Sequence, residues 1–200
     1  MVLLFNRWDS KDVKVNDLGL AAYINLDVKI VPHTFGVMAG KRFNKKKVNI
    51  VERLINKIMR TGQGKRKLSG KFIRGRGIPG NKLQAMRIVE DAFTIIEQKT
   101  KKNPLQIFVQ AIENSSPRED VTRLKRGGIS FTEAVDVSPV KRLDEALKNI
   151  ALAAFAVSFN NKKTASEALA SEIILAANND AKSYAVKRKE ETERIAKASR

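Results

Sequence analysis

The 200-residue sequence contains no cysteine and only one histidine, His33. Without cysteine there are no disulfides or thiolate metal ligands, and one imidazole cannot build a His-rich zinc site. Catalysis by His33 would require a carboxylate or serine partner, whereas the Pro32-His33 pair is typical of a turn. The apolar run Val2 to Phe5 is too short for a signal peptide, and no stretch approaches the roughly 20 apolar residues of a spanning helix. We therefore expect a soluble, intracellular protein with no membrane association.

Acidic residues are also scarce. The chain has 21 Asp and Glu against 39 Lys and Arg, which gives a formal net charge of +18 at pH 7 and a pI of about 10.3. A compact chain with this much like charge repels itself, so we expect a polyanion partner that neutralises it. The hydrophobic content of 42% is enough to form a core, and the length suits one domain with extensions.

The shortage of acids is greatest between residues 41 and 82. This fifth of the chain has fifteen basic side chains and a single acid, Glu52, so it carries fourteen of the eighteen net positive charges. A solvated helix face usually alternates charges of both signs, and this segment does not. The pattern therefore favours a phosphate-binding surface over a surface that is merely soluble.

A second basic feature is a predicted β-hairpin. The run Arg123-Leu124-Lys125-Arg126 leads into Gly127-Gly128 and then Ile129-Ser130-Phe131. A Gly-Gly pair between extended runs permits the positive φ angles of a two-residue turn. In that register Arg126 faces Ile129, Lys125 faces Ser130 and Leu124 faces Phe131. A ribbon with three cations and an aromatic near its tip suits a nucleic-acid groove, and an ordinary surface hairpin is the alternative.

Apolar residues at spacings of three and four predict helices in most of the remaining chain. The first begins after Asn49 and ends at Thr61-Gly62, and the second has a stripe of Leu83, Met86, Val89, Phe93 and Ile96. Asn103-Pro104 caps a third helix that ends at Ser115, and Ser138-Pro139 opens a fourth with Leu143, Leu147, Ile150, Ala154 and Val157 facing inward. Thr164 to Glu167 matches a capping box for a fifth helix. Asp180 is the predicted cap of a last helix, whose Lys187-Arg188-Lys189 cluster fits RNA binding and a solvated face equally well.

Residues 63–81 contain five glycines and many cations, and they are predicted to form a basic loop that a partner orders. The expected fold class is therefore mainly α, a bundle of five to six helices with an inserted two-stranded β-ribbon and a basic N-terminal extension. The expected domains are an extension over residues 1–47 and a helical domain over 48–200, with the basic loop at 63–81 and the hairpin at 119–137.

Two motifs resemble catalytic or cofactor sites only superficially. Gly75 to Gly80 satisfies G-x-G-x-x-G, but no buried strand precedes it and Pro79 removes an amide donor, which argues against a dinucleotide site. Glu119-Asp120 is a single acidic pair, whereas Mg²⁺-dependent nucleases typically bring several carboxylates together. We expect no cofactor, no metal site and no enzymatic activity. The alternatives are a free-standing RNA or DNA chaperone and a nucleic-acid-processing enzyme.

Several runs resemble the small-subunit ribosomal protein seven family. They are Val48 to Arg60, Asn103-Pro104-Leu105, Glu113 to Asp120, the Gly-Gly hairpin, Ala134 to Pro139 and Ser183-Tyr184-Ala185. Together they cover residues 48–200 in order. The N-terminal segment, with Trp8-Asp9 and Val15-Asn16-Asp17, is similar to the archaeal and eukaryotic branch.

The resemblance implies a structural constituent of the cytoplasmic small ribosomal subunit that binds the 3′ major domain of its rRNA and helps to nucleate assembly of the head. It also implies a hairpin near the exit-site tRNA and the mRNA path, and contacts with neighbouring ribosomal proteins. The expected rRNA-binding residues are Lys41, Arg42, Lys45, Lys46, Lys47, Arg53, Lys65, Arg66, Lys67, Lys71, Arg74, Arg76, Lys82, Lys141 and Arg142. The expected hairpin residues near tRNA and mRNA are Arg123, Lys125, Arg126, Gly127, Gly128 and Phe131.

Overall fold

The computed structural model describes residues 3–27, 29–36, 44–68, 71–74 and 80–200. Of the predicted rRNA-binding residues, Lys41, Arg42 and Arg76 lie outside these ranges. For residues 63–68, 71–74 and 126 only the backbone is described.

The described chain is mainly helical, as the sequence predicts. The longer helices are α2 (Ile50–Met59), α3 (Lys82–Thr100), α4 (Pro104–Ser115), α5 (Pro139–Ser158), α6 (Ala165–Ala177) and α7 (Tyr184–Ala198). Two short elements precede them, α1 (Leu18–Ala21) and the 3₁₀ helix η1 (Asn44–Lys47). The remaining elements are two separate pairs of antiparallel strands.

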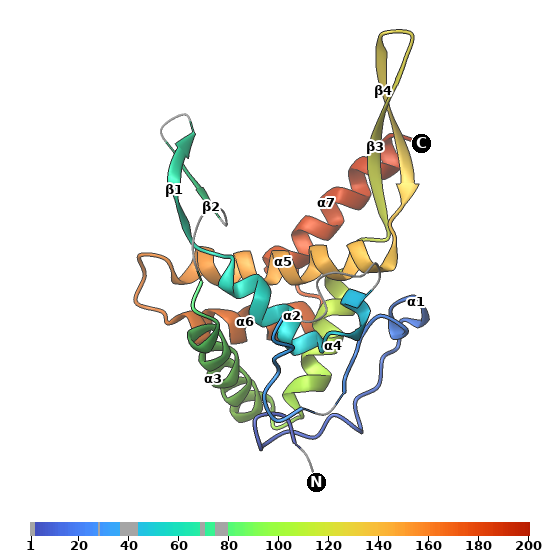
Figure 1. Ribbon diagram of the computed structural model, residues 1–200. Helices are drawn as coiled ribbons and strands as arrows, with labels where there is room; N and C mark the ends of the chain where they lie inside the picture. Colours follow the sequence, from blue (N-terminus) through green and yellow to red (C-terminus); the bar gives the residue numbers. More distant parts are fainter. Residues whose placement is uncertain (1–2, 28, 37–43, 69–70, 75–79) are drawn as a thin grey trace.

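Helix α6 lies at the centre of the body, where it packs against α3, α4 and α5 (Figure 1). Its Leu169 and Ile173 are fully buried, and its alanines are buried on several faces. A helix that is apolar all round needs neighbours on all sides, and short alanine side chains let those neighbours approach closely.

The predicted inward stripes are correct in the middle of the helices and wrong at two ends. Leu143, Leu147 and Ile150 of α5 are fully buried, but Val157 is 41% exposed. Leu83 of α3 is 58% exposed, although it continues the apolar stripe. Both lie in the terminal turn of their helix, where the periodicity continues but the layer of partner side chains has ended.

Local capping signals hold in most places. The Asn103 side chain accepts from the Leu105 amide, and Thr164 forms the predicted capping box with Glu167. The prediction of Asp180 as the last cap was wrong, because Ser183 caps α7 by accepting from the Val186 amide. The carboxylate of Asp180 instead accepts from the Lys182 amide in the turn before the helix.

The predicted hairpin is confirmed residue by residue. Strands β3 (Glu119–Arg126) and β4 (Ile129–Asp136) pair with Arg126 opposite Ile129, Lys125 opposite Ser130 and Leu124 opposite Phe131. Gly127 and Gly128 have φ angles of 57° and 83°, which a two-residue turn of this kind requires.

The described part of segment 63–81, which was predicted to be a basic loop, contains another pair of strands. Strand β1 (Gln63–Leu68) runs antiparallel to β2 (Lys71–Arg74), with Lys67 opposite Phe72 and Leu68 opposite Lys71. The sequence did not predict these strands because the segment is rich in glycine and lysine, which are less frequent in strands than in other structure.

The N-terminal segment contributes to the core. Leu4, Trp8, Leu20 and Ile24 are all at most 7% exposed and belong to the same hydrophobic cluster as the helices. Trp8 packs edge-on against Phe93 of α3. Residues 3–27 are thus a packed strap rather than a free tail.

The pair β1–β2, called the first ribbon, and the pair β3–β4, called the second ribbon, project from the same side of the helical body (Figure 1). Helix α5 begins directly after β4, and its far end lies beside Thr61 and Gly62 at the base of β1, where these residues share the lining of one pocket. A 20-residue helix is about 30 Å long, so the bases of the two ribbons are separated by roughly that distance. Helix α7 packs alongside β3 and β4.

Candidate nucleic-acid interface

The three lysines of η1 form the exposed start of the basic segment. Lys45, Lys46 and Lys47 are all exposed. The C-terminal end of η1 is tied to the N-terminal segment, because the Asn25 side chain donates to the Lys47 carbonyl at 2.8 Å and the Ile50 amide donates to the Asn25 carbonyl. The N-terminal segment therefore helps to position the element that carries the three lysines.

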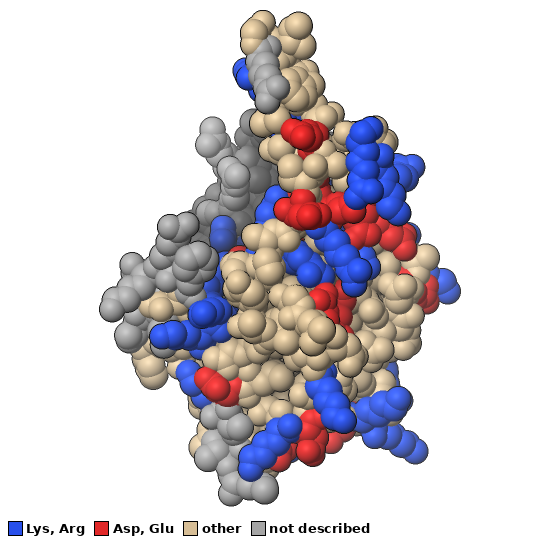
Figure 2. Space-filling view, turned by 90° about the vertical axis from the view of Figure 1, so that its right-hand side faces the viewer, with Lys and Arg blue, Asp and Glu red and all other residues tan. Residues whose placement is uncertain are grey.

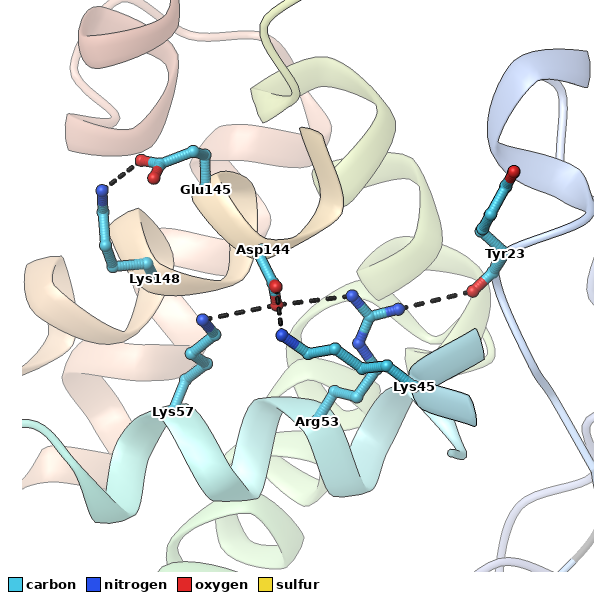
Figure 3. Close-up of polar contacts among 7 residues, drawn as sticks. All are labelled: Tyr23, Lys45, Arg53, Lys57, Asp144, Glu145 and Lys148. Atoms are coloured by element: carbon cyan, nitrogen blue, oxygen red, sulfur yellow. Dashed lines mark hydrogen bonds and ion pairs between the residues drawn. The ribbon is translucent and has the colours of Figure 1, made fainter. Parts of the chain in front are cut away.

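One acid of α5 gathers cations from two other elements (Figure 3). The Asp144 carboxylate contacts the Lys45 ammonium through Oδ2. Its Oδ1 is 3.3 Å from Lys57 Nζ and 3.4 Å from Arg53 Nη2. Three cations on one carboxylate leave this cluster with a net charge of +2 beside the lysines of η1.

The pKa directions in the cluster follow from these contacts. Burial raises the pKa of Asp144, but the hydrogen bond of Lys45 and the charges of Lys57, Lys45 and Arg53 outweigh it, so the pKa lies below its ordinary value of 3.8. Burial and, secondarily, the nearby charge of Lys45 lower the pKa of Lys57 despite the attraction of Asp144.

Two of the predicted rRNA-binding arginines are committed to contacts inside the protein. The Arg53 side chain is 3% exposed and also donates to the Tyr23 carbonyl. Arg142 is 8% exposed, and its Nη2 lies 2.6 Å from Asp17 Oδ2 and 3.2 Å from Ser116 Oγ. These guanidinium groups fasten the N-terminal segment to α2 and α5, so they are less available to phosphate than the exposed lysines of η1.

Lys82 and Lys141 are paired with acids but remain partly accessible. The Lys82 ammonium lies 2.7 Å from Glu52 Oε1, and Glu52 is almost fully buried. The same oxygen accepts from the amide and hydroxyl of Thr34, so Glu52 also anchors the N-terminal segment. Lys141, whose side chain is 54% exposed, pairs with Asp120 at 2.6 Å.

The second ribbon, formed by β3 and β4, has cations at register positions on both of its faces, with Arg126 on the same face as Leu124 and Phe131. Directly opposed residues share a face and alternate along the strand, so Arg123 and Lys125 lie on one face and Leu124 and Phe131 on the other. Arg123 and Lys125 are exposed, and a Cβ placed on Gly127 or Gly128 would meet nothing within 4 Å. The tip therefore projects clear of the described body.

The first ribbon places five predicted cations on a defined backbone. Lys65, Arg66 and Lys67 belong to β1, and Lys71 and Arg74 belong to β2. Because β1 follows α2 after a short turn, these five positions extend the series of cations that begins with η1 in the sequence.

The positive charge is not spread evenly over the protein. Figure 2 shows a face on which Lys and Arg are interspersed with Asp and Glu. Two ion pairs illustrate this mixing of charges: Arg188 pairs with Glu191 on α7, and Arg200 pairs with Glu119 of β3. Since such pairs neutralise each other, Lys187-Arg188-Lys189 is a weaker phosphate-binding candidate than η1.

Sequence reasoning did not identify the contacts that join Lys57 and Asp144 to Lys45 and Arg53. Lys57 lies one turn after Arg53 on α2, so the basic helix gave a usable signal for it. Asp144 is one of two adjacent acids and lies 99 residues from Lys45, and no sequence pattern connects it with that lysine.

The described part of the chain has pockets of two kinds. A polar pocket of about 580 Å³ is lined by residues that include Asp17, Glu113 and Glu193, and these acids are engaged by protein groups: Asp17 pairs with Arg142, Glu113 accepts from the Asn16 and Asp17 amides, and Glu193 accepts from the Arg118 amide. An apolar pocket of about 320 Å³ lies between the ends of α2, α3, α5 and α6, and its lining includes no acid, base or histidine. No group of three or more His, Asp or Glu with metal-binding geometry occurs in the described part of the chain. None of the described helices is long and apolar enough to cross a bilayer.

A helical body with two projecting ribbons and exposed lysines along η1 is suited to binding a polyanion over its surface. The family model of ribosomal protein S7p/S5e matches residues 21–200. The chain belongs to this family, whose members have a structural rather than an enzymatic role.

Relatives in archaea match over the whole length. The small ribosomal subunit protein uS7 of Methanococcoides burtonii is 47% identical over 200 residues, which is all of both chains. The proteins of the same name from Methanothermobacter thermautotrophicus and Picrophilus torridus are each 48% identical, over 199 and 198 residues, and at least 98% of each chain is covered. The archaeal and eukaryotic branch expected from the N-terminal segment is thereby confirmed.

Proposed function

We propose that this chain is a constituent of the small ribosomal subunit that binds the 3′ major domain of its rRNA and helps to nucleate assembly of the head. The observation that carries the proposal is the concentration of positive charge on η1, α2 and the first ribbon, three consecutive elements of which α2 is packed in the core. Structured RNA presents mainly phosphates, 2′-hydroxyls and shape, which suits a basic edge with projecting ribbons better than a pocket.

Each bound phosphate releases condensed counterions, so the affinity for RNA falls steeply as salt is raised. The interface comprises Lys45, Lys46, Lys47 and Lys82 together with the cations of the first ribbon. Lys141 extends it towards the second ribbon. Contacts with neighbouring ribosomal proteins belong to the same proposal and fit the remaining, mixed-charge surface.

The test of the rRNA footprint is a double charge reversal, Lys46→Glu with Lys47→Glu. Neither lysine has an ion pair in the described structure, so the fold should be retained. We expect binding to an rRNA fragment of the 3′ major domain to weaken by about tenfold or more at moderate salt. Lys162→Glu with Lys163→Glu is the matched control, an exposed lysine pair between α5 and α6 with the same change in charge. Equal affinities of the two variants would contradict the assignment.

The second ribbon has a separate role in this proposal, beside the exit-site tRNA and the mRNA path. The exposed Arg123 and Lys125 and the projection of the tip clear of the described body support that role. Removing residues 123–132 and joining Thr122 to Glu133 through a Gly-Gly turn keeps the strand register, and it should leave helix content and rRNA affinity unchanged and disturb exit-site tRNA occupancy in reconstituted subunits. A trimmed protein that failed to bind rRNA would refute this division of roles.

A free-standing RNA chaperone would use the same surface without entering a particle. Sedimentation of the tagged chain with small subunits distinguishes the two, since a chaperone would remain in the light fractions.

A further inference from the structure

Asp144 occupies an unusual position for an acid in an RNA-binding surface. It lies within the basic edge, its side chain is only 21% exposed, and it contacts three cations that would otherwise be available to phosphate. An acid placed there by chance would weaken RNA binding, because it repels phosphate and competes for the same ammonium groups.

The geometry of the contacts gives this carboxylate a different effect. Lys45 comes from η1 and Lys57 from α2, and Asp144 binds one ammonium through each of its oxygens (Figure 3). An ammonium has three donors, so each lysine keeps donors for a further acceptor while it contacts the carboxylate. The Lys45 and Lys57 side chains are 49% and 21% exposed, so both remain accessible from solvent.

Arg53 completes the arrangement from beneath. Its buried guanidinium contacts Asp144 and the Tyr23 carbonyl, which fixes the carboxylate from the protein side. Without Asp144 the Lys45 and Lys57 ammonium groups would repel each other. Both side chains would then be ordered only when RNA binds, and the loss of their rotamer freedom would reduce the binding free energy.

We propose that Asp144 is a positioning residue that holds Lys45 and Lys57 together to bind one phosphate of the RNA backbone. This inference rests on the proposed rRNA binding and assigns a single phosphate site within that interface. Lys45 and Lys57 contact the phosphate, and Asp144 acts through them.

The test is Asp144→Asn, for which positioning and simple electrostatics predict opposite results. The substitution removes one negative charge and keeps the side-chain shape, so electrostatics alone predicts tighter RNA binding. Positioning predicts weaker binding, by about tenfold for two lysines that must now be ordered on binding. Affinity for the rRNA fragment is measured as a function of salt, and the loss of a phosphate contact should also make the salt dependence shallower.

The neighbouring residue provides a matched control. Glu145 pairs only with Lys148 on the same helix, so Glu145→Gln makes the same change in charge one position away without touching the cluster. We expect Glu145→Gln to bind as tightly as the wild type or more tightly. If Asp144→Asn binds as tightly as Glu145→Gln, Asp144 is a competitor of phosphate and the proposal is overturned.

Lys45→Gln and Lys148→Gln keep the proposal testable if Asp144→Asn fails to fold. The two lysine side chains have similar exposure, 49% and 45%, and each pairs with an acid of α5. Lys45→Gln should weaken binding several-fold more than Lys148→Gln, and in its background Asp144→Asn should cause little further loss. Equal affinities of the two lysine variants would overturn the phosphate site. A wild-type protein with no affinity for the fragment would refute the proposed function itself, which none of these comparisons would do.

Discussion

Trp8→Ala tests whether the N-terminal strap is an integral part of the fold. The indole is 4% exposed and packs edge-on against Phe5 and Phe93, and its Nε1–H donates to Glu97 at 3.0 Å. Truncation of a buried aromatic typically costs about 3–5 kcal/mol, which includes the cavity that remains. We therefore expect the free energy of unfolding to fall by about 4 kcal/mol.

The measurement is urea unfolding followed by far-UV circular dichroism. With a slope of about 2 kcal/mol per molar urea, the expected loss moves the midpoint down by about 2 M. Since Trp8 is the only tryptophan, its fluorescence in the wild type reports on the strap alone, and that transition should coincide with the loss of helix. If Trp8→Ala unfolds outright, Trp8→Phe should show a smaller loss, of about 1–2 kcal/mol.

Leu18→Ala is the control for this prediction, because Leu18 lies in the same strap but is 89% exposed. Its effect should stay within about 0.5 kcal/mol. The packing argument would be refuted if Trp8→Ala and Leu18→Ala had the same midpoint, or if the wild-type fluorescence transition preceded the loss of helix.

Two further predictions concern charged groups. Arg142→Met should lower the free energy of unfolding by about 2–3 kcal/mol, because it leaves the mostly buried Asp17 without its partner, and combining it with Asp17→Asn should recover part of that loss in the same urea assay. Folding lowers the pKa of Asp17 and Asp144, so the stability that these groups supply is complete above their ordinary pKa of 3.8 and is lost as the pH falls below it. Thermal melts should therefore show a steeper loss of stability below about pH 4 for the wild type than for Asp144→Asn, and parallel curves would contradict the role of Asp144.

Short-range features were predictable because the chain encodes them within a few residues. The Gly127-Gly128 turn fixes the hairpin register through positive φ angles, and Asn103 and Thr164 cap helices through amides two or three residues away. The cap of α7 went wrong by three residues because Asp180 and Ser183 are both good cap residues, and packing decides between them.

Composition and local spacing are enough to specify that the chain is mainly helical, that it carries a ribbon with a Gly-Gly turn, and that its positive charge is concentrated in one segment. Tertiary structure alone decided which cations face solvent. Arg53 and Arg142 look like any other basic residues in the sequence, yet Asp144 and Asp17 draw them inside from 91 and 125 residues away. Burial and ion pairing depend on which distant side chains meet, and only the folded chain brings them together.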